Sequence, residues 1–75
     1  MQDFSSPNTL ILGLGATGWS CARYLAAQQQ PFAVIDSRPL PPKLEEFQQH
    51  FQTTPLHLGD LNSPWLTTAQ QLILS

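Results

Sequence analysis

Residues 8–18 read NTLILGLGATG, and in this stretch a short apolar run leads directly into three glycines. Continuous rather than alternating apolarity predicts a strand covered on both faces, as in a parallel sheet. In the G-x-G-x-x-G turn, Gly13 lets the chain reverse, Gly15 leaves room for a diphosphate, and Gly18 lets the following helix pack on the sheet. The first N–H groups of that helix favour an anion, and Thr17 adds a hydroxyl donor. The turn therefore predicts a nucleotide phosphate site.

The rest of the chain alternates between helix and strand patterns. A helix is expected from Ala16 to about Gln29, where the approach of Pro31 ends it. An apolar strand at 32–35 follows, with Asp36 at its C-terminal end. The later elements are expected to be a helix from Lys43 to about Phe51, a strand at 55–59, a helix capped by Ser63 with Pro64 at its first position, and a strand at 71–75. This order, β-α-β-α-β-α-β, predicts an α/β fold: a Rossmann-like parallel sheet with flanking helices.

Size and charge exclude several classes of protein. The chain has 75 residues, 41% of them hydrophobic, which fits one globular domain or less. Only three Lys plus Arg and a net charge of −2 argue against binding to nucleic acid. There is no signal-peptide pattern and no run of about 20 apolar residues, so we expect no membrane insertion and a cytoplasmic location.

The reactive side chains are few. The single cysteine, Cys21, excludes an internal disulfide and is expected to be a small core residue rather than a nucleophile. The two histidines, His50 and His57, lack the spacing of paired metal ligands, so we expect surface or loop positions and no metal site. There is no G-x-x-x-x-G-K-S/T segment and no nucleophile elbow, so we expect no catalytic residue in this chain.

Asp36 and Arg38 are the candidates for reading a nucleotide. Asp36 follows the glycine turn near the offset of about 20 residues at which an acidic residue contacts a ribose or base. Arg38 is placed to meet a phosphate, for example the 2′-phosphate of NADP. The residues alone favour NAD or NADP, hence a dehydrogenase cofactor domain, with a non-enzymatic nucleotide-sensing domain as a further alternative. A purely structural interpretation, in which the glycines serve a tight turn and Asp36 caps a loop, also stays open.

Four segments in order resemble the opening of the Mur ligases that add D-glutamate. They are residues 10–21, residues 35–38 with Pro41-Pro42, residues 57–61, and Trp65-Leu66 leading into residues 72–75. The glycine turn alone is unspecific, but the four together at these distances are not. The family's last segment runs on into a Ser-Pro-Gly turn, whereas this chain stops at the serine. We therefore expect residues 1–75 to be an incomplete N-terminal domain that binds a UDP substrate, with the central ATP-binding and C-terminal domains outside it.

The resemblance implies a cytoplasmic enzyme of peptidoglycan synthesis. Such ligases use ATP and Mg²⁺ to activate UDP-N-acetylmuramoyl-L-alanine as an acyl phosphate, which the amine of D-glutamate attacks. The ATP and Mg²⁺ sites would lie outside this chain, which alone would be inactive. Carried over to this sequence, a diphosphate would lie at Gly15, Ala16, Thr17 and Gly18, uracil against Asp36 and Ser37, and the uridine or diphosphate near Arg38. Threonine is common in the family where Ser37 stands, and serine keeps the hydroxyl.

Overall fold

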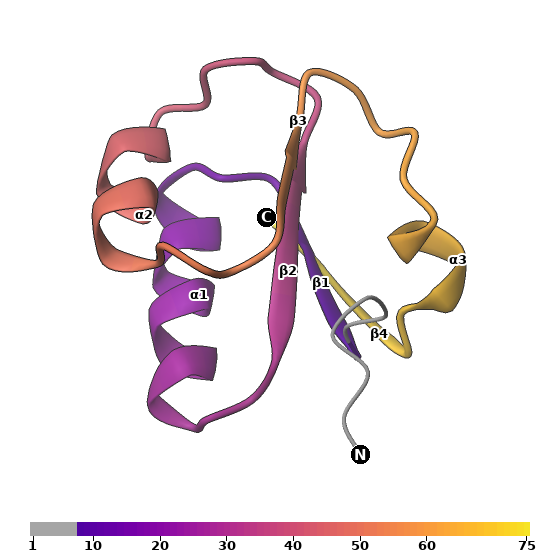
Figure 1. Ribbon diagram of the computed structural model, residues 1–75, viewed down its shortest axis with the longest axis horizontal. Helices are drawn as coiled ribbons and strands as arrows, with labels where there is room; N and C mark the ends of the chain where they lie inside the picture. Colours follow the sequence, from indigo (N-terminus) through magenta and orange to yellow (C-terminus); the bar gives the residue numbers. More distant parts are fainter. Residues whose placement is uncertain (1–7) are drawn as a thin grey trace.

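The computed structural model describes residues 8–75 and contains a four-stranded parallel sheet in the order β3-β2-β1-β4. Its elements in chain order are β1 (Thr9–Leu12), α1 (Ala16–Ala27), β2 (Phe32–Asp36), α2 (Leu44–His50), β3 (Leu56–Leu58), α3 (Trp65–Thr68) and β4 (Gln71–Leu74). Helices α1 and α2 cover one face of the sheet and α3 lies on the other (Figure 1). The predicted Rossmann-like α/β order and the parallel pairing are confirmed.

The core has a cluster on each face of the sheet. On the α1 and α2 face the buried residues are Ile11, Leu14, Ala22, Leu25, Phe32, Val34 and Phe47, with Cys21 half-buried against them. On the α3 face they are Leu10, Ala33 and Ile35. All five residues of β2 are buried, because β2 is paired on both sides and covered on both faces. This explains why its apolar run is continuous rather than alternating.

Helix α1 ends at Ala27, two residues earlier than expected. Gln29 takes a left-handed conformation with φ of 56°. Its N–H donates to the Ala26 carbonyl, and the N–H of Gln30 donates to the Leu25 carbonyl, both at 3.0 Å. This is the Schellman arrangement, which usually places glycine at the left-handed position. A glutamine there hides the stop signal from a sequence pattern.

The connections around α3 follow the predicted capping. The Trp65 N–H donates to Ser63 Oγ at 3.2 Å, and Pro64 has helical backbone angles. Of the two histidines, His50 is exposed at the end of α2, whereas His57 lies half-buried in strand β3 rather than in a loop. Within residues 8–75, no helix is long and apolar enough to cross a bilayer, and no three metal-binding side chains gather.

Candidate nucleotide-binding site

The sheet topology places the candidate site at the carboxyl end of β1. From β1 the chain passes through α1 to β2 on one side, while β4 pairs on the other side after α3 on the opposite face. Open parallel sheets bind ligands just outside such a reversal of strand order. In this chain the reversal coincides with the turn that begins at Gly13.

The backbone conformation and packing of the turn require glycine at two positions. Gly13 has φ of +107°, and its N–H donates to the Ile35 carbonyl at 2.8 Å. A Cβ on Gly18 would lie 1.9 Å from the Gly13 carbonyl oxygen, so only glycine lets α1 approach the end of β1 so closely. Both roles match the sequence interpretation.

Gly15 is different, because neither its backbone nor its neighbours require glycine. Its φ of −99° and ψ of −158° are extended, and a Cβ there would meet nothing within 4 Å. The open space lies at the N-terminus of α1, where Gly15 is the N-cap and offers no side-chain cap. The first N–H groups of a helix have no intrahelical acceptor, and Ala16 and Thr17 are exposed in this first turn. An anion can therefore approach these N–H groups directly.

The Asp36 carboxylate lies beneath this turn and is 3% exposed. Its Oδ2 accepts from the Leu14 N–H at 2.8 Å and from Arg38 Nη2 at 2.6 Å. Its Oδ1 accepts from the Arg38 backbone N–H at 2.8 Å and from Arg38 Nε at 2.9 Å. The side-chain hydrogen bonds from Arg38 are the main cause that lowers the pKa of Asp36 to about 2; burial opposes them, and the two backbone N–H groups assist.

Asp36, Ser37 and Arg38 line one cavity of about 290 Å³ at the ends of β1 and β2. Gly13 and Leu12 line the same cavity, so the predicted nucleoside-reading residues do meet the glycine turn. Ser37 is exposed, and the Arg38 side chain is 51% exposed although its fork is held by Asp36. The volume is at the lower end for ligand pockets, which suits one end of a nucleotide. The four residues predicted to hold the diphosphate, Gly15, Ala16, Thr17 and Gly18, do not line this cavity. They form the N-cap and first turn of α1, which follow Gly13 in the chain.

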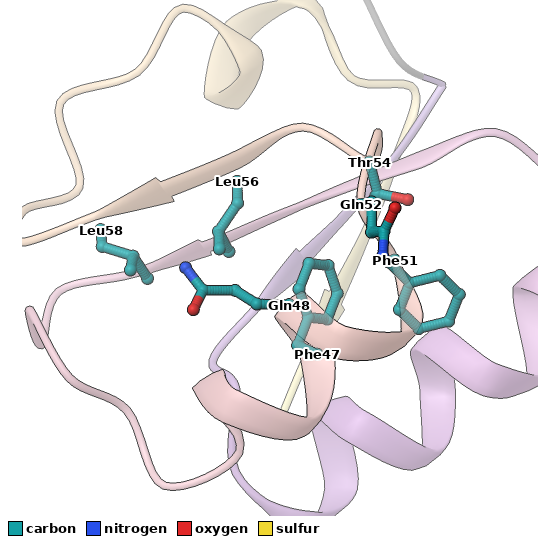
Figure 2. A pocket seen from close by; sticks show the side chains of 7 residues that line it. All are labelled: Phe47, Gln48, Phe51, Gln52, Thr54, Leu56 and Leu58. Carbon is teal, nitrogen blue, oxygen red and sulfur yellow. The ribbon is translucent and has the colours of Figure 1, made fainter.

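A larger hollow of about 620 Å³ lies between α2 and the edge strand β3 (Figure 2). Its apolar lining is Phe47, Phe51, Leu56 and Leu58, and its polar lining is Gln48, Gln52 and Thr54. None of these side chains is ionisable, and none belongs to the predicted site. We therefore choose the candidate site by the chemistry of its lining residues and not by the size of its cavity.

Sequence reasoning assigned no role to two residues that the structure brings to the site. Leu61 is 44% exposed and lines the smaller cavity from the loop after β3. Ser75 follows β4, and its Oγ lies 2.9 Å from the Gly13 carbonyl oxygen and 3.0 Å from that of Leu12. The available signals were an apolar side chain within the polar segment 59–63 and a hydroxyl at the carboxyl end of a predicted parallel strand.

The parallel sheet and its flanking helices define a domain of the Rossmann-like α/β class, with a candidate nucleotide site at the carboxyl end of β1. Within that class, residues 7–75 match the family model described as Mur ligase MurD-like, N-terminal domain. The chain therefore belongs to this family.

Curated relatives carry the same family identity. The chain is 49% identical over 67 residues, 89% of its length, to UDP-N-acetylmuramoylalanine–D-glutamate ligase of Coxiella burnetii strain RSA 331. It is 42% identical over 71 residues to the enzyme of that name from Marinobacter nauticus and 39% identical over 75 residues to that of Haemophilus influenzae strain PittEE. These matches cover 95% and 100% of the chain. The chain spans 15–16% of the length of these relatives.

Proposed function

We propose that this chain is the UDP-binding N-terminal domain of a cytoplasmic, ATP-dependent ligase that adds D-glutamate to UDP-N-acetylmuramoyl-L-alanine in peptidoglycan synthesis. The name of the relatives supports the reaction. The observation that carries the binding role is Gly15, whose missing side chain serves no described contact and opens the N-terminus of α1 to an anion. The whole domain, residues 1–75, is assigned to the UDP end of the substrate.

The parts of the ligand are assigned by charge and hydrogen bonding. The diphosphate would lie at Gly15, Ala16, Thr17 and Gly18, where the helix dipole and free N–H groups favour negative charge. The uracil and ribose would enter the cavity of about 290 Å³ lined by Asp36, Ser37 and Arg38. A 2′-phosphate in the same cavity would meet the Arg38 guanidinium, whose charge the buried Asp36 carboxylate already neutralises, so the cavity offers it little net positive charge.

The residues of this chain do not fit ATP or Mg²⁺. The sequence has no phosphate loop of the G-x-x-x-x-G-K-S/T type, and residues 8–75 hold no group of three His, Cys, Asp or Glu side chains suited to a metal. We therefore assign ATP, Mg²⁺ and D-glutamate to other parts of the full-length ligase and no catalytic residue to this chain. The chain alone would bind without catalysing ligation.

Replacement of Gly15 by valine tests the proposal most directly. Because a Cβ at Gly15 meets nothing within 4 Å, the variant should fold as the unaltered protein does but obstruct the diphosphate. We expect affinity for UDP-N-acetylmuramoyl-L-alanine to fall on the order of 100-fold, about 3 kcal/mol, in a titration followed by NMR.

Ala27→Val is the matched control, because it adds bulk at the exposed opposite end of the same helix. Its affinity should equal that of the unaltered protein. NADH and NADPH are titrated in parallel. Tighter binding of either dinucleotide than of the UDP ligand would reject the ligase proposal and support a dehydrogenase cofactor domain. Equal binding of the UDP ligand by Gly15→Val and Ala27→Val would show that the diphosphate does not lie at this turn.

A further inference from the structure

Asp36 joins three loops at the carboxyl edge of the sheet. Its side chain holds the Leu14 N–H of the glycine turn, 22 residues away in the chain, and the backbone and guanidinium of Arg38. Its own backbone carbonyl accepts from the Gly59 N–H at 3.0 Å, which ties in the loop after β3. Each of these loops contributes residues to the candidate site.

The carboxylate has little capacity left for a ligand. Two carboxylate oxygens offer about four lone-pair sites. Four N–H donors already approach Asp36, two at each oxygen, at distances of 2.6–2.9 Å. The side chain is also 3% exposed, whereas that of Arg38 is 51% exposed. A ribose hydroxyl or a uracil N–H would have to displace a charge-assisted or buried hydrogen bond to reach it.

We propose that Asp36 is a positioning residue of this site: its carboxylate fixes the Leu14 end of the glycine turn and the Arg38 guanidinium, and these elements rather than Asp36 contact the nucleotide. This role rests on the proposed function, because it concerns how a residue of that same site works. A guanidinium already held in one geometry loses less side-chain entropy when a ligand binds. The contact between Leu14 and Asp36 holds the N-terminus of α1 in register with the cavity.

Three ligands separate positioning from direct contact. UDP, CDP and 2′,3′-dideoxyuridine diphosphate share the diphosphate but differ in the base or in the ribose hydroxyls. Their affinities would be measured by NMR titration for the unaltered protein, for Asp36→Asn and for the control Glu45→Gln, which makes the same acid-to-amide change at an exposed position of α2 outside the cavity. We expect Asp36→Asn to weaken all three by the same factor, on the order of tenfold, because one amide cannot accept from all four donors.

The outcomes distinguish this role from the proposed function. A change in the UDP to CDP ratio, or in the UDP to dideoxy ratio, in Asp36→Asn would show direct reading of base or ribose and overturn positioning alone. Unchanged affinity of Asp36→Asn for all three would also overturn it. Failure of the unaltered protein to bind any of the three would reject the proposed function, and positioning with it.

A measurement on the unaltered protein decides the matter even if Asp36→Asn does not fold. With UDP at saturation, positioning predicts that the Leu14 N–H and the Arg38 Nε–H stay bonded to Asp36. Both protons should then exchange with solvent as slowly as in the free protein. If Asp36 contacts the ligand directly, a ligand donor must replace one of its four N–H donors, and faster exchange on binding of the Leu14 N–H or of any Arg38 N–H bonded to Asp36 would overturn the proposal.

Discussion

The first part of this chain, residues 8–50, and the second part, residues 51–75, differ in how deeply their side chains are buried. Every residue that is buried within the described range lies at or before Phe47, in β1, α1, β2, α2 and the loops between them. In residues 51–75 the best-covered side chains are half-buried, and Leu72 and Leu74 are 48% and 77% exposed. The first part therefore holds the core, and the second covers one face and two edges of it.

The difference follows from where the elements lie in the sheet. Strands β1 and β2 are central and paired on both sides, whereas β3 and β4 are the edges. Helix α3 has four residues, too few to be stable without the face it covers. The site is formed mainly by the first part, with Leu61 and Ser75 supplied by the second. The candidate ligand cavity therefore lies where the well-buried first part meets the less buried second part.

The same substitution in neighbouring strands tests this comparison with the largest expected effect. Leu10 in β1 is 0% exposed and Leu74 in β4 is 77% exposed. Leu10→Ala should lower the free energy of unfolding by about 2–5 kcal/mol, because it leaves a cavity. Leu74→Ala should change it by less than about 0.5 kcal/mol. Urea denaturation followed by tryptophan fluorescence measures both, and similar losses would show that β4 carries as much of the core as β1.

The carboxylates of the two parts should respond differently to acid. The pKa of Asp36 is lowered from 3.8 to about 2, so its contribution is fully present above pH 3.8 and is lost as the pH falls towards 2. The shift corresponds to about 2 kcal/mol of stability. Asp36→Asn should remove that part of the pH dependence when unfolding is measured between pH 2 and 6.

Asp60 in the second part is the matched carboxylate. Its hydrogen bond from His57 also lowers its pKa, but its side chain is 55% exposed. Solvent screens such a pair, so Asp60→Asn should leave the acid profile nearly unchanged. A larger loss of acid sensitivity in Asp60→Asn than in Asp36→Asn would reverse the comparison.

The sequence predicted the order and pairing of the elements because local signals carry them. The continuous apolar runs at 10–12 and 32–35 and the glycine turn sufficed to predict the parallel sheet. Boundaries were less predictable, because tertiary contacts fix them. The N–H of Lys43, for example, donates to the Leu14 carbonyl at 3.2 Å, and α2 begins only at Leu44.

The site was predicted as a set of residues but not as a geometry. Asp36, Ser37 and Arg38 do share a cavity with Gly13. That Arg38 folds back onto Asp36 depends on the path of the loop at 37–40, which no residue pattern states. Ser75 reaches Gly13 only because β4 pairs with β1, a contact between residues 62 positions apart. The spacing of residues along the sequence does not show which strands pair, so contacts that depend on such pairing could not be predicted.

The smallest expected effect concerns two residues with positive φ, one taken from each part of the chain. Gln29 has φ of 56° and Gly59 has φ of +98°, and a Cβ at Gly59 would meet nothing within 4 Å. Gln29→Gly should raise the free energy of unfolding by about 0.5–1 kcal/mol, because strain is relieved at some entropic cost. Gly59→Ala should lower it by about 1 kcal/mol through backbone strain alone. Thermal unfolding of both variants measures the pair. Loss of stability in Gln29→Gly would mean that side-chain contacts of Gln29, rather than the backbone of this turn, stabilise the end of α1.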